Sequence, residues 1–330
     1  MKVRTAAGAG AQVGDPSHVQ VVGDFVGDDR DEVFSYGYGT SSDHLVSFQR
    51  SGAPGSELDV SSTDFTVNGL YTPVAGDFDG DGHDEILWYA GGTRQDYMWD
   101  FTSPTTVTSR PYTANGWDYW PLAGDYTGDG ADDILWYLPG TGQDYLWDYA
   151  AGGTYTSSAR RIDGSYWALV GSFGTDATDD VLWYGQGSTR ADSLWDFHPD
   201  GSQSGRALRI DGTYNPTVLD IFDDGTGGDD VVWYAPGTAA DRAWDFVSGT
   251  HRSFGLTVNG SYRAVTGDFS GDGHEDVLWL DDTKANLWDF SAPGAGANAV
   301  ERWDYALQAS AFTQGEPGGD VGSKGATLTR

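Results

Sequence analysis

The feature that most constrains the fold of this 330-residue chain is an internal repeat of 46 to 50 residues. Each repeat begins with Gly-Asp-Phe or a close variant, continues through a turn rich in Asp and Gly, and reaches a short apolar run. A Trp in that run recurs at Trp88, Trp136, Trp183, Trp233 and Trp279, and Ser35 takes its place in the first repeat. A second Trp, followed by Asp, comes about eleven residues later. Such self-similarity is typical of repeat architectures.

Each repeat is predicted to form four short β-strands. In the second repeat, aromatic and β-branched runs between Gly-rich breaks predict strands over 72–78, 85–89, 96–101 and 106–112. Four strands in a unit of this length are typical of a β-propeller blade. We therefore predict an all-β fold, a single propeller of six four-stranded blades, with a seven-bladed ring built from both termini as the alternative. The expected division is an N-terminal segment at 1–18, the propeller at 19–310, and a flexible, Gly-rich tail at 311–330.

Composition limits the classes of partner. Asp and Glu number 50 against 18 Lys and Arg, which gives a net charge of -32. Nucleic acids and anionic membranes are bound through clustered Lys and Arg, so neither is expected as a partner. No apolar run reaches the roughly 18 residues of a membrane span. The first residues lack the apolar segment of a secretory signal. Without Cys, the chain has no disulfide, thiolate metal site or Cys nucleophile.

The Asp-rich turn between the first two predicted strands has the spacing of a calcium loop. In the second repeat, oxygen ligands stand at positions 1, 3, 5 and 9, Gly stands at position 6, and position 7 offers its carbonyl. Hard oxygen ligands favour Ca²⁺ over softer metals. The three turns that keep this spacing offer Asp77, Asp79, Asp81 and Glu85; Asp125, Thr127, Asp129 and Asp133; and Asp268, Ser270, Asp272 and Asp276. We expect calcium at these three turns.

The other three turns depart from the spacing. Turn one has Val26 at position 3 and Asp29 at position 6, turn four has Ser172, Gly174 and Ala177, and turn five carries an extra residue. Calcium is therefore not assigned to them. Because Asp and Gly suit tight turns in any case, a metal-free set of β-turns is the alternative for all six.

The run from Gly76 to Tyr89, Gly-Asp-Phe-Asp-Gly-Asp-Gly-His-Asp-Glu-Ile-Leu-Trp-Tyr, resembles the FG-GAP/VCBS repeat. The resemblance covers nearly 290 residues and implies an integrin-α-like or lectin-like propeller with calcium between the first two strands of a blade. It says less about function, since one fold hosts many functions. Calcium loops of modest affinity are useful where calcium is abundant, so an extracellular, secreted protein is expected.

Propeller connectivity places the acidic turns on one face and the blade-to-blade links on the other. The opposite face collects aromatic, amide and cationic residues, a mixture that suits sugars because rings stack on C–H faces and polar groups bind hydroxyls. The candidate ligand-binding residues are Tyr71, Arg94, Asp96, Trp117, Trp120, Asp144, Trp167, Arg190, Asp192, Tyr214, Arg242 and Tyr262.

These observations favour a calcium-stabilised extracellular module that binds glycans. The alternative is a protein–protein interaction module of a secreted adhesin or toxin assembly. No Gly-x-Ser-x-Gly, His-Glu-x-x-His or phosphate-binding Gly loop is present, and the six histidines share no catalytic motif. An enzyme is therefore not expected, and a polysaccharide hydrolase or lyase is the third hypothesis.

Overall fold

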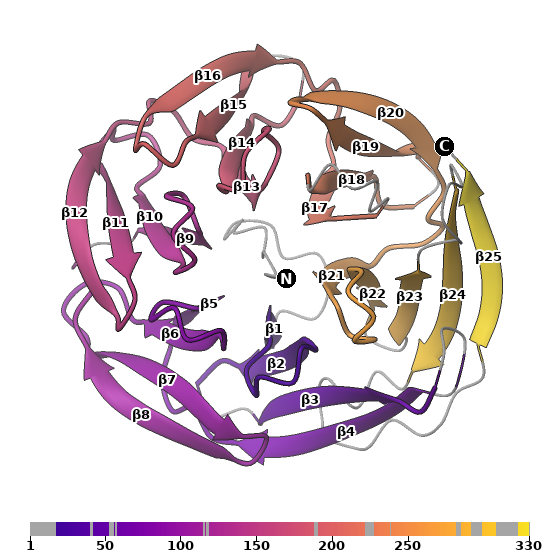
Figure 1. The fold of residues 1–330 in the computed structure, drawn as a ribbon, viewed down its shortest axis with the longest axis horizontal. Coiled ribbons are helices and arrows are strands. Elements are labelled where there is room, and N and C mark those ends of the chain that lie inside the picture. Colours follow the sequence, from indigo (N-terminus) through magenta and orange to yellow (C-terminus); the bar gives the residue numbers. More distant parts are fainter. Residues whose placement is uncertain are drawn as a thin grey trace.

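The computed structural model describes residues 18–39, 42–52, 56, 58–114, 116, 119–187, 191–221, 228–237, 239–281, 285–291, 299–307 and 323–329. Within these residues, six antiparallel sheets are arranged as blades around a central axis (Figure 1). The first strand of each blade lies nearest the axis and the following strands lie progressively outward. Each innermost strand contacts the next, and β21 contacts β1, so the ring is closed. Over the same residues, no helix has the length and apolarity needed to cross a membrane.

The strand bounds follow the sequence repeats. Blade 1 consists of β1 (His18–Gly23), β2 (Glu32–Gly37), β3 (Asp43–Arg50) and β4 (Leu58–Phe65). Blade 2 consists of β5 (Thr72–Gly76), β6 (Glu85–Tyr89), β7 (Asp96–Ser103) and β8 (Thr106–Tyr112). Blade 3 consists of β9 (Trp120–Gly124), β10 (Asp133–Tyr137), β11 (Asp144–Ala150) and β12 (Thr154–Arg160).

The second half of the ring continues this order. Blade 4 consists of β13 (Trp167–Gly171), β14 (Asp180–Tyr184), β15 (Asp192–Phe197) and β16 (Gln203–Leu208). Blade 5 consists of β17 (Asn215–Leu219), β18 (Asp230–Tyr234), β19 (Asp241–Val247) and β20 (Thr250–Leu256). Blade 6 consists of β21 (Arg263–Gly267), β22 (Asp276–Leu280), β23 (Ala285–Ser291), β24 (Ala299–Leu307) and β25 (Ser323–Thr329).

The predicted all-β propeller of six four-stranded blades is confirmed, and the seven-bladed alternative is not what the described residues form. One difference lies at the C-terminal end. Residues 311–330 were expected to form a flexible tail, whereas Ser323–Thr329 forms β25 and pairs with β24 as a fifth strand of blade 6. The outer edge of β24 leaves main-chain groups unpaired, and a strand added there satisfies them.

Five of the six blade interfaces share one aromatic contact. The Trp near the end of the second strand packs edge-on against the Tyr near the end of the second strand of the preceding blade, as Trp136 does against Tyr89, with ring centroids 5.1 Å apart. The five pairs are Tyr36–Trp88, Tyr89–Trp136, Tyr137–Trp183, Tyr184–Trp233 and Tyr234–Trp279. All five Trp side chains are buried. The Trp and Tyr that recur in the sequence repeats are therefore the residues that join one blade to the next.

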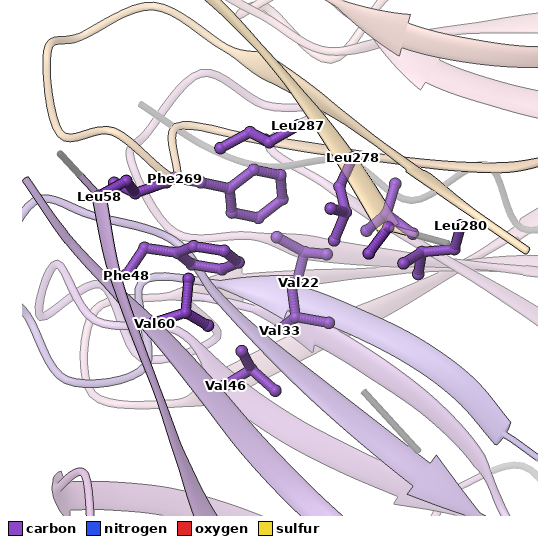
Figure 2. Packing of buried hydrophobic residues seen from close by; sticks show 12 residues of the cluster. Val22, Val33, Val46, Phe48, Leu58, Val60, Phe269, Leu278, Leu280 and Leu287 are labelled. Atoms are coloured by element: carbon purple, nitrogen blue, oxygen red, sulfur yellow. The ribbon is translucent and has the colours of Figure 1, made fainter. Parts of the chain in front are cut away.

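The interface between blades 6 and 1 lacks that aromatic pair. Leu280 stands where the other blades have the Tyr, and Ser35 stands where they have the Trp. An aliphatic cluster with two phenylalanines fills this interface instead (Figure 2). The Phe48 and Phe269 rings lie 4.9 Å apart in it. The two departures from the repeat thus fall on the same interface, where the two ends of the propeller meet.

The carboxylate that directly precedes the second strand of each blade joins that blade to the preceding one. Asp132 accepts a hydrogen bond from the Asp77 N–H of the preceding blade at 3.0 Å, and the Asp132 N–H donates to the Asp77 carbonyl at 2.7 Å. We call this carboxylate contact the inter-blade clasp. It is made by Asp31, Asp84, Asp132, Asp179, Asp229 and Glu275. Asp31 of blade 1 accepts from the Asp268 N–H of blade 6, so the clasps also complete the ring.

Candidate functional site

The acidic turns are held by their own first residue. In blade 2, Asp77 accepts main-chain hydrogen bonds from Gly80 and Asp81 on Oδ1, at 2.7 and 3.0 Å, and from Gly82 on Oδ2, at 3.0 Å. Gly80 and Gly82 both have positive φ, of 72° and 96°, which a residue without Cβ adopts readily. Asp125 and Asp268 make the same three contacts in blades 3 and 6. The predicted turn geometry is therefore formed.

Three predicted metal ligands of blade 2 lie together. Oxygen atoms of Asp77, Asp79 and Glu85 are within 4.8 Å of one another. The fourth, Asp81, is exposed and accepts a hydrogen bond from the His83 N–H at 3.0 Å, so it closes the turn. Asp129 and Asp272 cap their turns in the same way. The clustered set is thus positions 1, 3 and 9, with position 5 on its rim.

The oxygen at position 3 is buried and has no hydrogen-bond partner in any of the three intact turns. These atoms are Asp79 Oδ1, Thr127 Oγ1 and Ser270 Oγ. A buried polar atom without a partner costs about 1–3 kcal/mol, so a ligand that supplies the missing contact is stabilising. A hard cation is such a ligand for an oxygen donor. The residues present therefore fit calcium, which would be held through positions 1, 3 and 9.

The carboxyl at position 9 is anchored deep in each blade. Asp133 accepts hydrogen bonds from the N–H groups of Tyr126, at 3.0 Å, and Tyr149, at 2.8 Å. Burial raises the pKa of Asp133 to about 8. Burial, followed by the charge of Asp79, raises the pKa of Glu85 to about 9. Burial therefore disfavours the ionised form of these two carboxyls. A divalent cation bound beside them would favour the ionised form instead.

Blade 6 differs because an arginine already neutralises part of its turn. The Arg50 guanidinium, at the end of β3 in blade 1, contacts Asp272 Oδ2 at 3.2 Å and also pairs with Asp289 of β23. Arg50 and Asp289 are both buried. Of the predicted ligands Asp268, Ser270, Asp272 and Asp276, Asp272 therefore already pairs with a cation of the chain itself. Sequence reasoning missed this pair, because no local pattern connects Arg50 with a turn more than two hundred residues away.

The turns that depart from the calcium spacing keep different parts of it. In blade 1, Asp24 still accepts hydrogen bonds from Gly27, Asp28 and Asp29, although Val26 offers no oxygen at position 3. Residues 222–227 of turn five lie outside the described residues. Turn four brings Asp176, Asp196 and His198 together instead.

The predicted division of the loops between two faces is seen in the contacts. The loop after the second strand of a blade lies against the link that leads to the next blade, as in the Gly39–Gly69 and Gly237–Gly260 bridges. We call this side the link face. On the opposite side, the hairpin of blade 3 reaches the turn of blade 2, where the Gly152 N–H donates to the Asp79 carbonyl at 2.7 Å. The acidic turns therefore lie on the other face, the turn face.

The link tyrosines are fixed in place. The Tyr166 N–H donates to the Tyr137 hydroxyl at 3.0 Å, and that hydroxyl donates to the Gly164 carbonyl at 2.8 Å. A Cβ on Gly164 would lie 2.7 Å from the Tyr166 ring, so only glycine fits beneath it. Tyr71, Tyr214 and Tyr262 have the same arrangement. All four predicted link tyrosines are half-buried.

Three predicted ligand contacts serve the fold instead. Asp96, Asp144 and Asp192 are buried at the start of the third strand of their blades. Asp144 illustrates their role: Oδ1 accepts from the Leu138 N–H at 2.8 Å, and Oδ2 accepts from the Ile162 N–H at 2.7 Å. Asp144 therefore joins the loop after the second strand of its blade to the link that leads to the next blade. Sequence alone could not distinguish these buried structural aspartates from exposed ones, because both kinds recur once per repeat.

The remaining predicted ligand contacts vary in exposure. Trp120 and Trp167 are the first residues of β9 and β13, neighbouring innermost strands, and both are half-buried. Arg94 and Arg242 are exposed on the link face. Trp117 and Arg190 lie outside the described residues.

Comparisons with known proteins agree with this architecture. The structure is similar to that of an Agrocybe aegerita lectin, described as specifically recognising non-reducing terminal N-acetylglucosamine, with a TM-score of 0.56 at 15% identity over 83% of this chain and 77% of the lectin. Looser matches are BBS1N in complex with ARL6DN, with a TM-score of 0.44 at 11% identity over 97% of each chain, and the V. cholerae biofilm matrix protein Bap1, with a TM-score of 0.26 at 11% identity over 99% of this chain and 84% of that protein.

No protein-family model matches the chain, so the resemblance to FG-GAP/VCBS repeats stays a prediction. No curated protein matches it either. At these identities, structural similarity shows the fold alone. The chain is a six-bladed β-propeller similar in fold to a fungal lectin.

Proposed function

We propose that this propeller is a calcium-stabilised, extracellular module that binds glycans on its link face. The observation that carries the proposal is the ring of half-buried link tyrosines, each with its main chain hydrogen-bonded and its ring packed over a glycine and edge-on against a buried Trp: Tyr71, Tyr166, Tyr214 and Tyr262. Rigid, partly exposed aromatic residues suit the C–H faces of sugars. Because they are fixed before binding, little conformational entropy is lost on contact.

Polar groups border these rings. Two successive links present exposed ion pairs, Arg161 with Asp163 at 2.9 Å and Arg209 with Asp211 at 2.8 Å. Guanidinium and carboxylate groups can donate to and accept from sugar hydroxyls. The arrangement recurs around the ring, and several weak sites on one molecule increase avidity for a multivalent glycan.

The lectin from Agrocybe aegerita supports the same class of ligand, because a propeller of this fold recognises a terminal sugar. Calcium in the turns of blades 2 and 3 would stabilise the turn face, opposite the ligand. Such a protein is proposed to act outside the cell, where calcium is abundant.

A second candidate function rests on a different part of the link face. Tyr38 and Leu70 are exposed, with 37% and 54% of their surface open to solvent, on either side of the Gly39–Gly69 bridge. An exposed apolar pair beside aromatic residues also suits a protein partner. This alternative corresponds to an interaction module of an adhesin or toxin assembly.

A glycan array tests the proposal directly. The wild-type chain is expected to bind one class of sugar, and a Tyr166→Ala/Tyr214→Ala double variant is expected to lose at least tenfold in affinity. Tyr155→Ala is the matched control, because Tyr155 is exposed on the outer strand β12 and away from the links. Thermal unfolding of both variants confirms that the ring is intact. A blank array across broad sugar classes would overturn the proposal, and capture of one defined protein through Leu70 would support the alternative.

A further inference from the structure

Blade 4 has lost the calcium pattern and gained a histidine. Ser172 and Gly174 stand at positions 1 and 3 of its turn, where the intact turns have Asp and an oxygen ligand. His198 follows Trp-Asp-Phe in the third strand of the same blade. The residues at the corresponding place in the other blades are Gln49, Thr102, Ala150, Val247 and Ser291. The two departures therefore coincide in one blade.

The structure brings this histidine to the altered turn. His198 Nδ1 lies 3.0 Å from Asp176 Oδ2, at position 5 of the turn, and 3.5 Å from Asp196 Oδ1 on β15. Ligands at about 2.0–2.1 Å from a tetrahedral zinc ion are separated by about 3.3 Å. His198 Nδ1 thus already lies at about the ligand–ligand spacing from both carboxylate oxygens, and ligand atoms of all three side chains lie within 4.8 Å of one another.

A carboxylate oxygen without a hydrogen-bond partner lies in this cluster, and the absent side chain of Gly174 leaves room beside it. Asp196 Oδ1 is buried and has no hydrogen-bond partner. A Cβ on Gly174 would be 3.0 Å from that oxygen, so the missing side chain leaves the approach to it open. Asp176 is oriented from behind by the Thr178 hydroxyl, which donates to Oδ1 at 2.6 Å. The three ligand side chains are each 28 to 32% exposed, which gives an ion access from solvent.

We propose that blade 4 binds a divalent transition metal ion of the zinc type through Asp176 Oδ2, Asp196 Oδ1 and His198 Nδ1. A solvent molecule completes the tetrahedron. The imidazole nitrogen makes this site softer than the all-oxygen turns of blades 2 and 3, so it prefers zinc to calcium. The blade that lost its calcium ligands has thereby become selective for a different ion.

Calorimetric titration of the full chain with zinc chloride, in excess calcium, tests this assignment. Calcium occupies the all-oxygen turns, and one equivalent of zinc is expected to bind without being displaced. His198→Gln and Asp196→Asn are each expected to weaken zinc binding at least tenfold. His83→Gln is the matched control, since His83 belongs to an all-oxygen turn, and it should bind zinc as the wild type does. Cobalt absorption provides a second readout of tetrahedral geometry.

Unfolding of each variant in chelator shows whether it folds, and Asp176→Asn replaces any variant that does not. Zinc binding that is unchanged in His198→Gln would overturn the proposal, as would displacement of zinc by calcium. An absence of zinc binding in the wild type would show that His198 and the two aspartates form an ion pair only.

Discussion

At the scale of single residues, several of the recurring Gly and Asp residues have a partner in the next blade. The glycine before the acidic turn is required because the clasp carboxylate of the next blade packs against it: a Cβ on Gly124 would lie 2.9 Å from Asp179 Oδ2. Blade 5 has Leu219 at this place, and there the clasp is the longer Glu275. The paired change keeps the contact while making room for a side chain.

Replacing Gly124 with Ala is expected to lower the free energy of unfolding by about 1–3 kcal/mol, because the added methyl overlaps Asp179 and Val170. Gly255→Ala is the control, since a Cβ there meets no atom within 4 Å. Its effect should stay within about 0.5 kcal/mol. Denaturant unfolding of both variants measures the difference. Equal effects would show that a side chain at position 124 fits beside the Asp179 carboxylate.

Sequence patterns predicted the Asp positions but not all of their roles. Asp77 and Asp79 stand in a spacing that has a known chemical meaning, so a metal site could be proposed from the sequence. Asp144 and Asp132 recur just as regularly, yet they bind main-chain N–H groups of a neighbouring loop and a neighbouring blade. These partners depend on the closed ring, which no local window of sequence contains.

At the scale of strands, the sequence was most informative. In blade 2 all four predicted strands match the structure to within two residues, and the first ends at Gly76, two residues early, because Asp77 already begins the turn. The short apolar runs correspond to β6 and its equivalents, all of whose residues are buried. The strand β25 was missed because its residues carry no part of the repeat.

One strand position interrupts the packing of the repeats. Ala243 of β19 replaces the larger residues Leu45, Met98, Leu146, Leu194 and Leu287 of the other blades. A small apolar pocket lies at this place, lined by Ala243, Phe254, Trp279 and Phe290 among others. The missing side chain accounts for the pocket.

Ala243→Leu is expected to fill the pocket and raise the free energy of unfolding by about 0.5–2 kcal/mol. The reverse change at the equivalent buried position, Leu194→Ala, should cost about 2–5 kcal/mol. Both are read from denaturant unfolding. A destabilised Ala243→Leu would show that the pocket is too narrow for leucine and that the surrounding strands do not adjust.

At the scale of the whole molecule, ring closure is the demanding step. Blade 1 and blade 6 are each built from their own end of the chain and meet without exchanging strands. Their interface depends on the aliphatic cluster of Figure 2, on the Asp31 clasp and on Arg50. The sequence showed that Ser35 replaces the repeated Trp in blade 1, but neither the Tyr–Trp pair of the other interfaces nor the contacts that replace it here could be predicted from it.

Arg50→Met is expected to destabilise the protein by about 3–5 kcal/mol, because it leaves the buried Asp289 without its cation. Arg161→Met removes an exposed pair, with side chains 75% and 69% open to solvent, and should cost less than about 1 kcal/mol. Comparison of their unfolding midpoints separates the two cases. A tolerated Arg50→Met would show that the apolar cluster and the Asp31 clasp hold the interface closed without Arg50.

Stability without calcium should fall as pH rises. Burial raises the pKa of Asp133 and of Asp180 to about 8, so in the folded protein both carboxyls keep a proton that the unfolded chain releases near pH 4. The folded state then binds more protons between these values, and its advantage is lost as pH rises through about 8. Calcium requires ionised ligands, so its stabilising effect should grow over the same range. Thermal unfolding in chelator and in calcium from about pH 5 to about pH 8 measures both trends. A midpoint in chelator that rises with pH would contradict this account.

In the proposed function, the link face of this propeller binds glycans while the turn face stabilises the ring. Hydrogen–deuterium exchange with and without the best glycan from the array distinguishes the two faces. Slower exchange is expected in the links around 68–71, 163–166, 211–214 and 259–262, with the turns at 77–85 and 125–133 unchanged. Protection confined to the acidic turns, or none at all when the glycan is saturating, would contradict this proposal.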